Sequence, residues 1–294
     1  MDKFLSTVLI GLISGAPFAL LALGMVLVYK GSKVFNFAQG EFGTIAAFAS
    51  YLLSFRLPVP VAMLFGVVVG VLMGLLTERL VVQPLFHAPK VTLLVATAAI
   101  TGGSVALQLA IGDASLRTYP SLKAGNAFQT WAVAVKWQQL LLVAALVVVA
   151  VGLYLFFKTN LGLAVLAASQ EPVATDLVGI GTRRMSALVW ALAGFVGGLA
   201  GVITAALQPF TPGFMTAEFL AFAFVAAVVG GMTSMPGAIL GSIVLGQVQA
   251  FSAAYLTEVQ WVADNVPAPG ELAVFALLLG VLAFRPTGLL GKEA

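Results

Sequence analysis

Apolar residues dominate nine stretches of the chain, and each stretch is about as long as a membrane-crossing helix. A hydrocarbon core about 30 Å thick requires roughly 20 apolar residues at 1.5 Å each. The stretches lack the alternation of barrel strands, and backbone groups in lipid must be hydrogen-bonded internally, so helices are predicted. The predicted spans cover residues 5–29, 34–54, 59–78, 91–112, 137–157, 186–206, 215–232, 237–255 and 268–284.

Composition supports a membrane protein. Hydrophobic residues make up 61% of the 294 positions and charged residues 9%, whereas soluble domains carry roughly a quarter charged residues. The spans are therefore expected to pack as one all-α, polytopic unit covering 1–294. The first apolar run has the look of a secretion signal, but it continues to Tyr29, which is too long for a signal core of roughly 7–15 residues.

Lysine and arginine favour the cytoplasmic side of a membrane protein. If the polar stretch 158–184 is cytoplasmic, that side collects nine of these residues and the opposite side five. The loop 256–267 has two acids and no base, as expected of an outer loop. The bias predicts an outside N-terminus and an inside C-terminus. The N-terminal side would be reversed if one block only dips into the membrane and returns.

The second block contains a polar interruption, FNFAQGEFG at 35–43. Glycine weakens a helix, and backbone freed at membrane depth has to face protein or a water-filled cavity. Asn36, Gln39, Gly40 and Glu41 are therefore candidates to line a solute path, since ionisable groups inside spans usually face a cavity or a partner. The alternative is that Glu41 lies near the inner surface and pairs with Lys33.

A second interruption, VVGGMTSMPGAILG, covers 228–241. A matching pair of broken segments, one in each half, points to a translocation path, so Gly230, Gly231, Ser234 and Pro236 are candidate path residues. The sequence TSMPG also suits a cytoplasmic turn between two ordinary helices, and both alternatives stay open. The scattered glycines in 191–202 are instead expected to permit close helix packing.

The polar stretch 158–184 contains a short helix candidate at 171–181. Glu171 and Pro172 suit a first helical turn, and Gly179 or Gly181 suits its end. Ala174, Leu177 and Val178 form a small apolar stripe, with Asp176 on the opposite face. This stripe predicts docking into a groove of another protein, or else an ordinary interfacial helix on the headgroups.

Catalytic motifs are missing from the sequence. There is no cysteine, the only histidine is His87 in a proline-rich loop, and no H-E-x-x-H motif is present. The G-x-x-x-x-G-K-[ST] phosphate loop is also absent, so ATP hydrolysis by that route is excluded. An enzyme is not expected. A secondary transporter or channel acting without an ATPase is the alternative to an ATP-driven permease, and it predicts ion-coupling carboxylates in mid-span.

Three segments resemble the permease subunits of ATP-binding-cassette importers of the branched-chain amino-acid family. They are GLISGAPFALLALGMVLVYKGSKVFNFAQGEFG (11–43), LAASQEPVATDLVGI (166–180) and AAVVGGMTSMPGAILGSIVLG (226–246). The resemblance covers nearly the whole length. It implies a single transmembrane permease domain of about eight to nine spans, with one or two interrupted helices and a cytoplasmic coupling helix. Gln39 departs from the family, in which many relatives have histidine, and glutamine cannot titrate near neutrality.

The resemblance also implies partners and a location. Such permeases work in a bacterial inner membrane with a second related permease, two cytoplasmic ATPases that bind ATP and magnesium, and an extracytoplasmic solute-binding protein. No cofactor is expected on this chain itself. The coupling helix would contain Glu171, Ala174, Leu177, Val178 and Gly179. The solute would be a branched-chain amino acid or a related small amino acid or amide.

Overall fold

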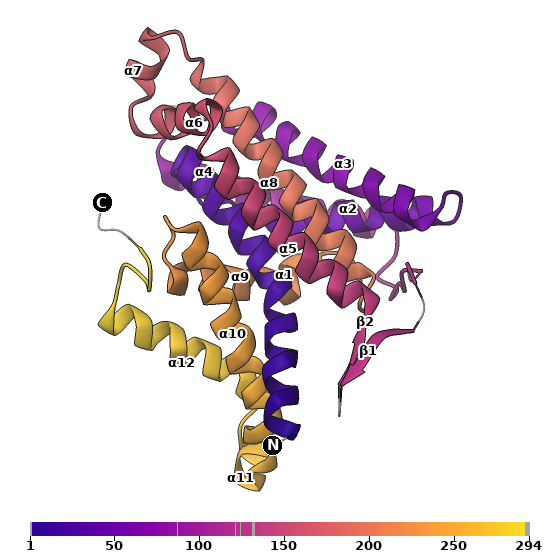
Figure 1. Cartoon of the computed structure of the whole chain (residues 1–294). Coiled ribbons are helices and arrows are strands. Elements are labelled where there is room, and N and C mark those ends of the chain that lie inside the picture. The colour runs from indigo at the N-terminus through magenta and orange to yellow at the C-terminus, as the bar shows by residue number, and fades with distance from the viewer. Residues whose placement is uncertain (1, 87, 121, 124, 131–132, 292–294) are drawn as a thin grey trace.

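The computed structural model describes the whole chain except residues 1, 87, 121, 124, 131–132 and 292–294, so His87 lies outside the described residues. Each of the nine apolar blocks contains a helix (Figure 1). The helices of the first half are α1 (Asp2–Ser32), α2 (Gln39–Ser54), α3 (Val59–Thr77), α4 (Lys90–Ile111) and α5 (Trp137–Phe156). Those of the second half are α6 (Asn160–Gln170), α7 (Pro172–Leu177), α8 (Thr182–Ala205), α9 (Ala221–Gly230), α10 (Met235–Tyr255), α11 (Gln260–Asn265) and α12 (Pro269–Phe284).

In the described part of the chain, six helices are long and apolar enough to cross a membrane, compared with the eight to nine spans that the sequence predicts. They are α1, α3 with its π-helical extension η1 (Glu78–Val82), α4, α5, α8, and α10 with the 3-10 turn η3 (Leu256–Glu258). The helices of the other three blocks are shorter. Both α2 and α12 have 16 residues. The third consists of the π-helical turn η2 (Met215–Leu220) and α9, and it runs only from Met215 to Gly230. Sixteen residues reach only about 24 Å.

The helices α1 and α8 form the centre of the bundle. In each, 67% of the most apolar window is buried inside the protein, compared with 11% in α4 and 17% in α5. The largest fully buried side chains include Trp190 on α8 and Leu20, Leu21 and Leu27 on α1. In Figure 1, α1 lies between α8 and the α9–α10 pair.

Glycines bring the central helices into backbone contact. A Cβ added at Gly70 on α3 would lie 2.7 Å from the Gly194 carbonyl oxygen on α8. A Cβ at Gly43 on α2 would lie 2.8 Å from the Gly197 carbonyl oxygen, and one at Gly15 on α1 would lie 2.7 Å from the Ser242 carbonyl oxygen on α10. The prediction that the glycines of 191–202 serve helix packing is confirmed, because close approach replaces the missing hydrophobic driving force between helices in lipid.

One outer segment departs from the all-α prediction. Residues 113–136 contain a two-stranded antiparallel sheet, β1 (Asn126–Thr130) with β2 (Val133–Lys136). The same segment is tied to the bundle by paired backbone hydrogen bonds of 2.9 Å between Arg117 and Phe210, and by a bond between the Tyr119 and Ser50 hydroxyls. The hairpin follows a glycine with positive φ, Gly125, a turn signal too weak alone to predict strands.

Basic side chains border hollows at both ends of the bundle. Lys33 and Lys90 border one hollow at the end where α6 and α7 lie, which we call the inner end. Lys123 and Lys136 border another hollow near the β hairpin, at the outer end. The N-terminus and α7 lie at opposite ends of the molecule (Figure 1).

Gly201 on α8 offers a test of this packing, because a Cβ there would overlap the Gly43 backbone on α2. We expect Gly201→Ala to lower the melting temperature of the purified chain in detergent, since overpacking costs about 1–3 kcal/mol. The control is Gly103→Ala in the middle of α4, where nothing lies within 4 Å of an added Cβ. Equal melting temperatures for the two variants would contradict the packing described here.

Candidate functional site

The first interruption separates α1 from α2. The chain leaves α1 after Ser32, passes Lys33 with φ 55°, and resumes a helix at Gln39. Asn36 organises the irregular stretch: its Oδ1 accepts from the Ala38 N–H at 3.0 Å, and its Nδ2 donates to Gln39 Oε1 at 3.1 Å. The asparagine thus satisfies polar groups that the break leaves without helical partners.

Gln39 links α2 to α8. Its Nε2 donates to the Ala193 carbonyl oxygen at 2.9 Å, and Gly24 on α1 and Gly197 on α8 leave the space that this side chain fills. Gln39 is fully buried. Because glutamine carries both a donor and an acceptor, it bridges Asn36 and the α8 backbone without a charge.

Glu41, two residues further along α2, is also fully buried. Gln108 Nε2 on α4 donates to its Oε2 at 2.6 Å, and the Thr216 hydroxyl on η2 donates to its Oε1 at 2.6 Å. Gln108 in turn accepts from the Gly213 N–H at 3.2 Å. The alternative pairing with Lys33 is therefore wrong: the carboxylate is held by an amide and a hydroxyl, well inside the bundle.

Gly40 completes this cluster by allowing η2 to approach α2. A Cβ at Gly40 would lie 2.5 Å from Thr216 Oγ1 and 2.9 Å from Thr216 Cα. The structure thus brings Asn36, Gln39, Gly40 and Glu41 together in packed protein. None of the four lines the inner cavity described below.

The second interruption is a tight turn between two antiparallel helices. Gly231 ends α9 with φ 105°, Ser234 Oγ accepts from the Gly237 N–H at 3.1 Å, and Pro236 lies in the first turn of α10. The turn joins α10 to the shorter apolar segment Met215–Gly230, which is not among the helices long enough to cross a membrane, so both alternatives stay open. Gly230 lets α9 and α10 touch, because a Cβ there would overlap the Gly237 backbone.

Residues 285–291 fold back onto this turn. The Leu289 N–H donates to the Val229 carbonyl oxygen at 2.8 Å, and the Leu290 N–H donates to the Gly230 carbonyl oxygen at 3.0 Å. These bonds satisfy carbonyl groups at the end of α9 that have no helical donor.

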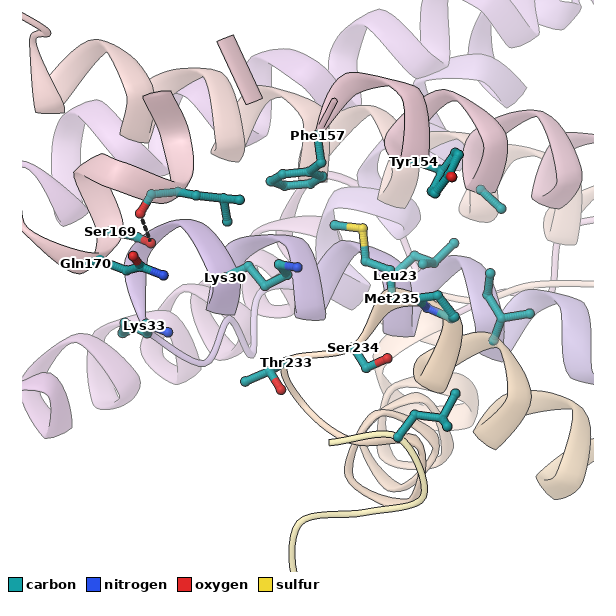
Figure 2. Close-up of a pocket in the computed structure, with 15 residues that line it drawn as sticks. Leu23, Lys30, Lys33, Tyr154, Phe157, Ser169, Gln170, Thr233, Ser234 and Met235 are labelled. Atoms are coloured by element: carbon teal, nitrogen blue, oxygen red, sulfur yellow. Dashed lines mark hydrogen bonds between the residues drawn. The ribbon is translucent and has the colours of Figure 1, made fainter. Parts of the chain in front are cut away.

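A cavity of about 690 Å³, the inner cavity, lies between α1, α5, α6 and this turn (Figure 2). Ser234 and Pro236 line it, and these are the only predicted path residues among its lining. Sequence reasoning missed most of its polar lining, which is Lys30, Lys33, Ser169, Gln170 and Thr233. Lys30 and Lys33 could have been predicted as lining residues, because both directly follow the end of the first apolar span.

The inner cavity is positively charged. Lys30 Nζ lies 5.1 Å from the centre of the Phe157 ring, and Lys33 Nζ lies 5.8 Å from the centre of the Tyr29 ring. Among the residues that the structure describes, no carboxylate lines the cavity. A neighbouring hollow of about 340 Å³ shares Lys33 and adds Lys90. Such a lining attracts a carboxylate or another small anion.

The predicted coupling residues lie at the surface of the inner end. The helix α7 covers Pro172–Leu177, with Glu171 at its N-cap and Gly179 just beyond its end at φ 85°. Ala174 is exposed, and the side chains of Leu177 and Val178 are 83% and 74% exposed.

Two further residues of this segment were not singled out from the sequence. Val173 is 74% exposed beside the predicted stripe, and Thr175 is the one buried residue of α7. The stripe predicted from helical spacing therefore points to solvent, and Val173 widens it.

Asp176 joins α7 to α8. Its Oδ1 accepts from the Thr182 N–H at 2.9 Å, and its Oδ2 accepts from the Thr182 hydroxyl at 3.1 Å. The carboxylate thus caps the first turn of the most central helix.

The bundle of apolar helices, with broken segments and a polar cavity at one end, defines a multi-pass membrane permease. The family model for the permease component of branched-chain amino acid transport systems matches residues 7–283. The chain belongs to this family, and it is a multi-pass protein of the bacterial inner membrane.

Named relatives cover nearly the same length. The high-affinity branched-chain amino acid transport system permease protein BraD of Pseudomonas aeruginosa is 30% identical, over 98% of this chain and 96% of the relative. The corresponding LivH protein of Escherichia coli K12 is 29% identical over the same shares. A probable LivH of Methanocaldococcus jannaschii is 27% identical over 93% and 88%. No solved structure matches the chain.

The buried hydrogen bonds of Glu41 make a testable difference between two variants. We expect Glu41→Gln to keep a melting temperature near that of the parent chain, because an amide can bond with both Gln108 and Thr216. Glu41→Ala should melt lower, because each buried polar group left unpaired costs about 1–3 kcal/mol. Thermal unfolding in detergent checks this, and a Glu41→Ala chain as stable as the parent would contradict a structural role.

Proposed function

We propose that this chain is the permease subunit of an ATP-driven importer and forms half of the translocation path for branched-chain amino acids or related small solutes. The observation that carries the proposal is the exposed apolar stripe on α7, at the inner end of a chain that belongs to this permease family. An exposed apolar stripe on a short helix fits a groove on another protein.

The ATPase groove is the occupant that this stripe suits best. The chain has no phosphate loop, so the energy for uphill transport has to come from other subunits. In the proposed complex, ATP and magnesium are bound by two cytoplasmic ATPases, and a second permease and an extracytoplasmic solute-binding protein complete the importer.

The fold offers a route for mechanical coupling. The helix α7 is tied to α8 by the two Asp176–Thr182 hydrogen bonds, and α8 contacts α2 and α3 through glycines. A displacement of α7 would therefore move a rigid block of helices rather than one side chain. Rigid-body motion of this kind is a recognised way to switch access between two sides of a membrane.

The proposed solute class rests on the relatives' named substrates and on the cavity chemistry. Lysines and hydroxyl groups in the inner cavity suit a carboxylate, and Leu23, Ala150 and Ile239 supply apolar lining. An amino acid with an apolar side chain has both features.

Substitution of Leu177 tests the coupling. In the importer assembled from the two permeases, the two ATPases and the solute-binding protein, we expect Leu177→Glu to lower ATP-driven uptake of L-leucine by about tenfold or more, since burying a leucine is worth about 1.5–3 kcal/mol. The ATPases should also fail to co-purify. Leu177→Met keeps an apolar side chain and should behave as the parent.

Two results would overturn the proposal. One is normal co-purification and uptake with Leu177→Glu. The other is accumulation of L-leucine against a gradient by this chain alone in vesicles, which would favour a secondary transporter.

A further inference from the structure

A second cavity, the outer cavity, lies at the opposite end of the bundle from the inner one. Its volume is about 250 Å³, and it is enclosed by α1, α5, the end of α8 and η2. It shares Lys136, Leu207 and Gln208 with a wider hollow of about 450 Å³ next to the β hairpin. Its size is just below the roughly 300–1,000 Å³ of pockets for drug-sized ligands, so it suits a smaller solute.

Two donor groups from separate elements line the outer cavity. Lys136, the last residue of β2, lines it, and among the described residues no carboxylate forms an ion pair with this lysine. Thr204 on α8 also lines it, is 2% exposed, and has a hydroxyl oxygen with no hydrogen-bond partner in the described part of the chain. A buried hydroxyl left unpaired is costly, and a polar ligand would satisfy it.

Acceptor groups face the cavity from two other elements. Pro17 lies inside α1 and has no N–H, so the Ile13 carbonyl lacks its usual helical donor, and both residues line the cavity. Gln208 Nε2 donates to Glu218 Oε2 at 2.7 Å. This bond orients the amide and leaves Gln208 Oε1 as an acceptor beside the cavity.

The remaining wall is apolar and aromatic. Phe18 lines the cavity with Leu142 and Phe219, and the centres of the Phe18 and Phe219 rings are 5.8 Å apart. The cavity therefore combines a cation with a hydroxyl, two neutral acceptors and an apolar wall.

We infer that the outer cavity binds a free α-amino acid with an apolar side chain before it crosses the membrane. The carboxylate would accept from Lys136 and from the Thr204 hydroxyl. The ammonium group would donate to the Ile13 carbonyl and Gln208 Oε1, with the Glu218 charge behind it. The side chain would pack on Phe18, Leu142 and Phe219. This inference rests on the proposed function, whose solute it places at a defined position.

The two cavities lie along the same face of α5. Gln139 and Leu142 line the outer one, and Ala150, Tyr154 and Phe157 line the inner one. These positions are three, four or eight residues apart, so they share one helical face. The eight residues from Leu142 to Ala150 span about 12 Å, and Val143 and Leu146 lie on that face between them. An apolar barrier thus separates an outer cationic site from an inner one.

The absence of cysteine from the sequence permits a direct test. Ser14 lines the outer cavity, and Ser14→Cys introduces a single thiol of similar size. In vesicles holding the complete importer, we expect L-leucine to slow labelling of this thiol by an impermeant maleimide. Leucinol, which lacks the carboxylate, should not slow it. The control thiol is Thr118→Cys, which borders only the wider hollow and should not be protected.

Lys136 is then changed in the Ser14→Cys background. With Lys136→Gln, the leucine concentration needed for half protection should rise by about tenfold or more, because a charge-assisted hydrogen bond is lost. Lys136→Arg should restore protection, and Lys123→Gln in the neighbouring hollow should leave it unchanged. Labelling without leucine should be the same in all variants, which shows that the bundle has kept its fold.

ATP-driven uptake of L-leucine, measured in the same vesicles, separates the two proposals. Uptake without protection of the thiol, or protection that survives Lys136→Gln, would overturn the outer site and leave the proposed function intact. Protection without uptake would support the site and overturn the proposed transport of leucine. If neither is seen, both proposals fall.

Discussion

Close contact between helix backbones is the constraint on which this fold depends. Helices in lipid gain no hydrophobic free energy by associating, so their association depends on short-range van der Waals contact. Gly43, Gly70, Gly194 and Gly197 place α8 directly against α2 and α3. That contact makes three helices behave as one body, and α7 is attached to this body through Asp176. The same block also carries the buried Glu41 cluster.

Polar groups inside the bundle divide into two kinds. Asn36, Gln39 and Glu41 are fully buried, and their side chains form hydrogen bonds with other protein groups. Lys30, Lys33 and Lys136 instead border cavities at the two ends. In this conformation the polar residues of 35–43 therefore hold helices together. The side chains that are placed to contact a solute are the cavity lysines.

Much of the fold could be predicted from the sequence because each apolar block carries its own signal. Length and hydropathy located the nine apolar blocks, each of which contains a helix, and the glycine spacing of 191–202 predicted close packing. The hairpin of β1 and β2 could not be predicted, because its strands are short and half-exposed. The length of α2 could not be predicted either. The helix begins only at Gln39, after the irregular stretch that the Asn36 hydrogen bonds stabilise, and hydropathy does not reveal such bonds.

The candidate site was harder to predict because its residues meet only in three dimensions. Ser234 and Pro236 were predicted as path residues from the glycine- and proline-rich interruption at 228–241, and they border the inner cavity. Lys136 and Thr204 belong to separate elements, and no local pattern connects them. Glu41 is fully buried, and its partners Gln108 and Thr216 come from distant parts of the chain, so its surroundings could not be read from the local sequence.

The contact of Leu289 and Leu290 with the end of α9 has a consequence for biosynthesis. Leu290 also lines the inner cavity, so this part of the cavity wall is missing while the ribosome is still translating α12. This side of the cavity can therefore close only after residues 285–291 have been synthesised and have bonded to the end of α9.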